Sequence, residues 1–399
     1  TTWTLHSAAK IVFGRRAVEQ VGEVVRRLDA RRVFLVTDRT LVAAGIVDEV
    51  FTPLHEAGIE IDVFSGGQAE PSLEVAEQAI ERAEAFAPEA IVAVGGGSNM
   101  DVAKYVAALL AHGGSPRDYF GEDRLPGPTL PVVCVPTTAG TGSEVSSSAV
   151  VSDPVAATKV SMLSNWLRPA AAIVDPLLTV TCPPQVTADS GIDALVHAIE
   201  AFTAVDNESF PLPPGERSVY QGINPLGDLT AREAIRLVGR HLVKAVKTGD
   251  DLDAREGMSL AATLAGLAFS NTGVAIVHAM EYPVGVLTHC SHGAGNGLLL
   301  PFAMRFNLPA RKERFAEIAE LLGESTAGLS IDAAAERAIV AVEKLKSTIG
   351  IPERLRDLGV QESHLPMLAE KAFGVKRLIR VNPRTVTQKD LEGVLRSAL

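Results

Sequence analysis

Short apolar runs alternate with amphipathic segments over the first half of the chain, and this alternation most limits the folds open to it. Four runs rich in valine and isoleucine have the composition of buried parallel strands, whose two faces are both covered. Between the runs, apolar residues such as Val102, Val106 and Leu109 keep helical spacing. We therefore predict a doubly wound, Rossmann-like α/β domain with a mostly parallel sheet. The expected strands are residues 31–38, 59–65, 90–98 and 131–138.

The strand pattern fades in the second half, where long amphipathic segments predict an all-α domain. We expect the α/β domain to cover residues 1–183 and the helical domain to cover residues 184–399. Thr230 and Glu233 have the spacing of a capping box, which predicts a helix start. Residues 206–228 contain four prolines and three glycines, so we expect a long surface loop there. The expected helices include residues 229–247, 252–269, 311–322 and 331–347.

Composition excludes several classes of function. The 399 residues suffice for two domains with large cores, and 47% hydrophobic and 21% charged residues are ordinary globular values. A net charge of −11 repels phosphate backbones and anionic headgroups, so we expect neither nucleic acid nor membrane as a partner. Three scattered cysteines, together with the lack of a signal-peptide or membrane-spanning pattern, predict a cytoplasmic protein.

The segment GGGSNMDVAK, residues 95–104, follows a predicted strand and runs into a predicted helix. Its glycines allow a backbone to approach a pyrophosphate closely, and the free amides and the helix dipole stabilise negative charge. The segment is not the G-x-G-x-x-G fingerprint, and it follows the third predicted strand rather than the first. Taken alone, a plain tight turn is an equally good interpretation.

A second loop, PTTAGTGSEVSSSAV at residues 136–150, follows the next predicted strand and carries several hydroxyl groups. A solvated polar loop and a phosphate-binding loop are about equally good interpretations of it. Asp38 ends the first predicted strand, where a carboxylate can accept hydrogen bonds from ribose hydroxyls and repel a 2′-phosphate. This position favours NAD over NADP, although an aspartate at a strand end is more often a turn or cap residue.

Histidines and an aspartate in the helical half have the spacing of a metal site. Asp193 and His197 are four residues apart, so both project from one helix face. A later segment supplies His278, His289 and His292. Each histidine alone is more often a surface or core residue, but imidazoles combined with a carboxylate suit a divalent transition metal such as Fe²⁺ or Zn²⁺.

These motifs resemble the iron-containing (group III) alcohol dehydrogenase family over nearly the whole chain. Four segments occur in family order: GGGSNMDVAK, PTTAGTGSEV, DALVHAIEAF and HAMEYPVG. A further histidine, His292, follows 14 residues after His278, the first residue of the last segment. The resemblance implies a dehydroquinate synthase-like architecture and a metal held by Asp193, His197, His278 and His292. It also implies that NAD is bound by Asp38, Gly95, Gly96, Gly97, Ser98, Asp101, Thr137, Thr138, Thr141 and Lys159.

One position departs from the family pattern. Many family members carry a further histidine four residues after the third metal ligand, often assigned to proton transfer, and Tyr282 stands there in this chain. We predict a catalytic or pocket role for Tyr282, although a phenol is a weaker base than imidazole at neutral pH. Tyrosine at this position is similar to the hydroxyacid-oxoacid transhydrogenase branch, whose longer insert between the two histidines is absent here.

We therefore predict an NAD(P)-dependent alcohol dehydrogenase, a function that uses two phosphate loops and a metal cluster together. Its metal, Fe²⁺ or alternatively Zn²⁺, acts as a Lewis acid while hydride passes between NAD(H) and a small alcohol, aldehyde, hydroxy acid or oxo acid. A hydroxyacid-oxoacid transhydrogenase or a maleylacetate reductase-like enzyme is the nearest alternative. A non-redox enzyme of the dehydroquinate synthase type and a metal-dependent sensor are the rivals from other classes. We expect a homodimer.

Overall fold

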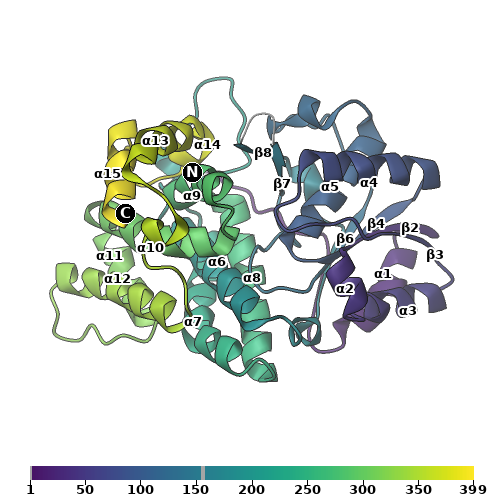
Figure 1. Cartoon of the computed structure of the whole chain (residues 1–399), viewed down its shortest axis with the longest axis horizontal. Coiled ribbons are helices and arrows are strands. Elements are labelled where there is room, and N and C mark those ends of the chain that lie inside the picture. Colours follow the sequence, from purple (N-terminus) through teal and green to yellow (C-terminus); the bar gives the residue numbers. More distant parts are fainter. Residues whose placement is uncertain (1, 154–157) are drawn as a thin grey trace. The chain divides into compact units, whose positions relative to one another are not determined.

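The computed structural model describes residues 2–153 and 158–399, and the chain divides into two compact units (Figure 1). One unit comprises residues 6–138 and 142–182 and contains the strands. The other comprises residues 183–399, the N-terminal residues up to Leu5, and the short segment 139–141. We describe each unit by itself.

The first unit is built on a six-stranded sheet in which every neighbouring pair is parallel. The four predicted strands are present, and two strands that we did not predict, β1 and β9, extend the sheet on the side of β6. In spatial order the strands are β1 (Ile11–Phe13), β9 (Ala171–Val174), β6 (Val132–Pro136), β4 (Ala90–Gly95), β2 (Arg32–Val36) and β3 (Glu60–Phe64).

The position assigned to two motifs within the sheet needs correction. Because β1 precedes β2, Asp38 follows the second strand and the glycine-rich turn follows the fourth, not the first and third as predicted. Strand β1 has only three residues, none of them fully buried, so its apolar run is shorter than the runs of the inner strands.

Helices cover both faces of this sheet, because neighbouring side chains of each inner strand point to opposite faces. In β2, Phe34 and Val36 pack into the core with helices α4 and α5, whereas Val33 and Leu35 pack into the core with α1 and α3. This is the doubly wound arrangement that the sequence predicts. The helices are α1 (Val21–Arg26), α2 (Arg39–Ala43), α3 (Asp48–Glu56), α4 (Leu73–Phe86) and α5 (Gly97–His112).

A second, three-stranded sheet in the same unit was not predicted. It has the order β5-β8-β7, with β7 and β8 antiparallel and β5 and β8 parallel. Burial alternates along β7, so only one of its faces packs against the core. The strands are β5 (Gly121–Glu122), β7 (Ser148–Asp153) and β8 (Thr158–Leu163).

The second unit is helical in its described residues. The predicted helices are present, but the capping box at Thr230 is wrong: the helix begins at Pro225, and Asn224 caps it by accepting a hydrogen bond from the Gly227 amide. The Thr230 hydroxyl donates to carbonyl groups of the preceding turn instead. The helices are α6 (Pro184–Thr203), α7 (Pro225–Lys247), α8 (Leu252–Thr272), α9 (Ile276–Thr288), α10 (His292–Asn307), α11 (Lys312–Leu321), α12 (Ile331–Thr348), α13 (Leu365–Gly374), α14 (Lys376–Ile379) and α15 (Gln388–Ala398).

The expected long loop is therefore shorter than predicted. Residues 210–224 contain no helix or strand, and a single 3₁₀ turn, Asn207–Ser209, precedes them. In the described part of the chain no single helix is long and apolar enough to cross a membrane. Helices α8 and α9 reach the required length and composition only as a pair bent by 105°.

Candidate metal centre and nucleotide loops

Helix α6 carries three polar side chains on one buried face. Asp193, His197 and Glu200 follow one another at intervals of four and three residues, so their side chains lie one above the other. All three are buried, although the helix is otherwise rich in alanine and aliphatic residues. Buried polar groups need partners, so these side chains must be satisfied by other residues or by a bound ion.

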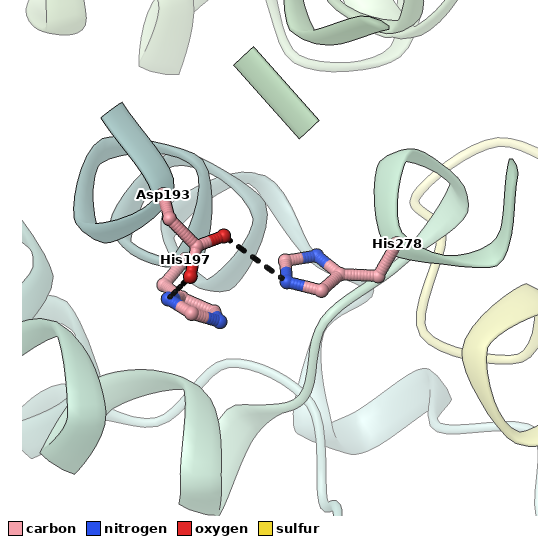
Figure 2. Close-up of side chains that lie close together, drawn as sticks. All are labelled: Asp193, His197 and His278. Carbon is pink, nitrogen blue, oxygen red and sulfur yellow. Dashed lines mark ion pairs between the residues drawn. The ribbon is translucent and has the colours of Figure 1, made fainter. Parts of the chain in front are cut away.

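Three imidazoles approach the Asp193 carboxylate. His197 Nδ1 lies 3.7 Å from Asp193 Oδ2, and His278 Nε2 lies 3.9 Å from Asp193 Oδ1. Figure 2 shows these two rings, from α6 and α9, turned toward the carboxylate. His292 at the start of α10 adds a third nitrogen, with Nε2 at 4.0 Å from Asp193 Oδ1. Ligand atoms of Asp193, His197 and His278 all lie within 4.8 Å of one another.

Two glutamates fix the orientation of the rings. Glu200 Oε2 lies 2.6 Å from His278 Nδ1, and Glu281 Oε2 lies 2.5 Å from His292 Nδ1. A carboxylate accepts a hydrogen bond, so each Nδ1 carries the proton and each Nε2 presents a lone pair toward Asp193. Carboxylates behind ligating histidines orient the ring in this way and raise its basicity.

The ring of His197 is held by packing. It stacks on Phe269 of α8 with a centroid distance of 4.3 Å and on His278 with a centroid distance of 4.7 Å, and its other polar contact is with the backbone of Gly140. Burial lowers the pKa of His197 to about 3, against the opposing effect of Asp193, so this imidazole is neutral at physiological pH.

The site has the donor set of a divalent metal centre. His197 Nδ1 and His278 Nε2 are buried without a hydrogen-bond partner in the described structure, and both face the same carboxylate. Burial alone raises the pKa of Asp193, but the three imidazoles and the Asn296 amide lower it below its usual value, so the carboxylate is ionised. These two nitrogens face an anionic oxygen with no proton donor between them and it, which fits a bound cation.

The nucleotide loops lie at the carboxyl ends of two neighbouring strands. Gly95 of β4 pairs with Pro136 of β6, and a Cβ atom on Gly96 would stand 3.3 Å from Thr138 Oγ1, so the loops are in contact. Gly96 is the N-cap of α5 without a side-chain cap, which leaves amides of the first turn available to an anion. Gly95 has a φ of 145°, and a Cβ there would collide with Asn99.

Lys104 and Asp101 tie the second loop to α5. The buried Lys104 ammonium donates to the carbonyl oxygens of Ser143 (2.8 Å), Ser146 (3.2 Å) and Ser148 (2.8 Å), and it also contacts the first two hydroxyls. Asp101 accepts hydrogen bonds from the Ser143 hydroxyl and a β7 amide. The structure thus gives Asp101 a role in ordering the loop, beside its predicted role in cofactor binding.

Asp38 and Lys159 also have partners within the protein. Asp38 is the N-cap of α2, where Oδ1 accepts from two amides of the helix, and its Oδ2 accepts from Asn99 Nδ2 at 2.9 Å. Lys159 pairs with Glu70 at 2.8 Å. The cap interpretation of Asp38 is therefore correct, and its selection of NAD stays a prediction.

Comparison with known proteins identifies the family. Residues 8–176 match iron-containing alcohol dehydrogenases, and residues 216–399 match the C-terminal part of the Fe-containing alcohol dehydrogenase family. The chain belongs to this family. The match confirms the predicted fold class and an oxidoreductase that acts on alcohols.

Individual relatives cover almost the entire chain. An NAD-dependent methanol dehydrogenase of Bacillus methanolicus is 38% identical over 97% of both chains. The crystal structure of a 1,3-propanediol oxidoreductase is 38% identical, with a TM-score of 0.93 and complete coverage of both chains. The mitochondrial hydroxyacid-oxoacid transhydrogenase of Rattus norvegicus is 32% identical over 98% of this chain and 89% of its own length.

Three further residues that the sequence analysis named, Tyr282, His289 and Thr141, differ in where they lie. Tyr282 lies in α9 one turn after His278, and its ring centroid is 6.2 Å from that of His292, so it borders the candidate metal site. His289 does not: it is exposed at the end of α9 in a left-handed conformation with a φ of 56°. Thr141 belongs to the segment 139–141, which groups with the helical unit.

Sequence reasoning missed the residues that support the site. Glu200 had a detectable signal, since it continues the helical face of Asp193 and His197. Asn296 lies one turn after His292, and its amide donates to Asp193 Oδ1 at 2.8 Å and contacts His292 Nε2 at 3.1 Å. Glu281 and Lys104 gave no comparable signal, because their partners lie on other segments of the chain.

Proposed function

We propose that this protein is a metal-dependent, NAD(H)-linked alcohol dehydrogenase whose ligands are Asp193, His197, His278 and His292. The convergence of three imidazole nitrogens on one buried carboxylate, with two of the nitrogens unpartnered, carries this proposal. Ferrous iron is the proposed ion, and zinc is the alternative, since the same donors accept both. When bound, the metal supplies a Lewis acid that polarises the substrate oxygen.

The chain's own residues hold and orient the reactants. The amides of Gly96, Gly97 and Ser98 bind the pyrophosphate of NAD at the N-terminus of α5, aided by Gly95 before them. Thr137, Thr138, Thr141 and Lys159 supply further polar contacts, and Asp38 accepts from the ribose. Glu200 and Glu281 keep their imidazoles in the tautomer that leaves Nε2 free of a proton.

Small alcohols and aldehydes are the proposed substrates, supported by similarity to a methanol dehydrogenase and a 1,3-propanediol oxidoreductase. A hydroxyacid-oxoacid transhydrogenase is the second candidate, and Tyr282 together with the transhydrogenase relative favours it. Turnover of a hydroxy acid with an oxo acid, without added NAD, separates this candidate from a dehydrogenase. The cytoplasmic homodimer stays a prediction.

Removal of one imidazole tests the metal centre. We expect His278→Ala to lose most of the bound metal and the NADH-dependent reduction of butanal. The matched control is His289→Asn, which removes an exposed imidazole from the same segment and keeps a residue type that tolerates the left-handed conformation. Metal analysis by mass spectrometry and an NADH absorbance assay measure both effects. Full metal content and activity in His278→Ala would overturn the ligand assignment.

A further inference from the structure

Arg377 is an arginine beside the metal site whose charge has no carboxylate partner in the described structure. It lies in α14, which packs against α9. Its Nη2 donates to the Tyr282 hydroxyl at 3.3 Å, and its guanidinium carbon is 5.7 Å from the Tyr282 ring centroid. Its Nε is buried without a hydrogen-bond partner. A buried donor without a partner is costly, so this guanidinium is poorly satisfied by the protein alone.

Other arginines of the helical unit differ in this respect. Arg380, one turn further along the chain, pairs with Glu216 at 2.8 Å. Arg314 pairs with Asp228 at 2.8 Å. Their charges are offset by neighbouring carboxylates, whereas Arg377 donates its hydrogen bond to the hydroxyl of a tyrosine.

The position of Arg377 connects it to the metal centre through one side chain. Tyr282 contacts Arg377 with its hydroxyl, and its ring lies beside that of His292. His292 in turn faces Asp193. A series of neighbouring side chains therefore runs from Arg377 through Tyr282 and His292 to Asp193.

We propose that Arg377 and Tyr282 form a subsite for an anionic group of the substrate. This inference rests on the proposed function and specifies its substrate class: a short aldehyde or alcohol that carries a carboxylate, sulfonate or phosphonate. A guanidinium binds two oxygens of such a group with its parallel N–H donors, and the phenol hydroxyl is a further polar contact. Recognition of the charge then orients the reacting carbon toward the metal.

Paired substrates test the subsite. Butanal and succinic semialdehyde have the same chain length and differ in a terminal methyl or carboxylate group; sulfoacetaldehyde and phosphonoacetaldehyde distinguish the other anions. We expect the wild-type protein to reduce at least one anionic aldehyde with a higher kcat/KM than butanal. Arg377→Gln should lower that value about 10–100-fold, the scale of a charged hydrogen bond, and leave butanal unchanged. Arg377→Lys should retain part of the preference.

The control is Arg384→Gln, which removes the same charge from an exposed arginine that lies on Phe306. A second experiment measures anion binding without the metal. Chelator-treated protein is titrated in a calorimeter with methylphosphonate, methanesulfonate and acetate. We expect binding of one probe to be lost in Arg377→Gln and retained in Arg384→Gln.

The outcomes separate the two proposals. If wild-type protein reduces butanal but neither prefers an anionic aldehyde nor binds a probe, the subsite is wrong and the dehydrogenase stands. If it reduces no aldehyde but binds a probe through Arg377, the dehydrogenase is wrong. Equal losses in Arg377→Gln and Arg384→Gln indicate a general charge effect and overturn the subsite.

Discussion

Glu200→Gln should weaken metal binding although the substituted residue is not a ligand. Glu200 accepts two hydrogen bonds, from the Val277 amide at 2.7 Å and from His278 Nδ1 at 2.6 Å. An amide side chain has one oxygen and one NH₂ group. If the oxygen keeps the Val277 bond, the NH₂ faces His278 Nδ1. That nitrogen must then accept, so the proton moves to Nε2, where it points at Asp193.

The expected magnitude follows from this change of tautomer. Partners that orient a ligating histidine change metal affinity by about 10–100-fold, which corresponds to about 1.4–2.7 kcal/mol. Glu281→Gln is the matched comparison, because Glu281 orients His292 in the same way. The His292 side chain is 25% exposed, whereas that of His278 is 3% exposed. Water can replace part of the lost hydrogen bond at the exposed ring, so we expect a smaller effect there.

Competition with a chelator of known affinity measures both dissociation constants, and circular dichroism verifies that the variants are folded. We expect metal affinity to decrease in the order wild type, Glu281→Gln, Glu200→Gln. Wild-type affinity in a folded Glu200→Gln variant would refute the argument, since the tautomer would then be set by other groups.

Four further predictions concern other parts of the structure. Lys104→Met should lower the free energy of unfolding by about 2–4 kcal/mol, because it leaves buried carbonyl groups unpaired; denaturant titration measures this, and an unchanged midpoint contradicts it. Asp38→Gly should reduce the preference for NADH over NADPH, seen as the ratio of the two kcat/KM values, with only a small loss of helix capping. Metal removal by chelation should lower Tm, since an ion at 100 times its Kd stabilises the folded state by about 2.7 kcal/mol; re-addition of Fe²⁺ or Zn²⁺ should restore it. Tyr282→Phe should raise KM for anionic aldehydes if the hydroxyl anchors substrate, or lower kcat about 100-fold or more if it relays a proton; unchanged constants would show that it does neither.

The inner part of the fold was readable from the sequence because its signals are local. Strands β2 and β4 are continuous apolar runs, since both their faces are covered. Strand β1 is an edge strand of only three apolar residues, and β7 alternates in burial, so neither contains a long apolar run. The start of α7 was misplaced because Thr230 also fits a capping pattern, whereas the helix is capped by Asn224 and begins at Pro225.

Spacing alone predicted contacts within the candidate site where its residues share a helix. Asp193 and His197 are one turn apart, so spacing alone predicts that they meet. The contact of Arg377 with Tyr282 joins residues 95 positions apart, and no periodicity in the sequence records it. The same holds for Lys104 and its loop, whose hydrogen bonds depend on how α5 packs against the segment after β6.

Charge balance connects the metal proposal with the supporting residues. Three carboxyl groups, those of Asp193, Glu200 and Glu281, are buried around three imidazoles, and burial keeps His197 neutral. Ionised carboxylates in such a setting repel one another in a low-dielectric surrounding. A divalent cation at the converging nitrogens offsets it directly. The glutamates therefore do more than orient rings: their charge raises the affinity of the centre for a cation, so replacing either one with glutamine removes attraction as well as orientation.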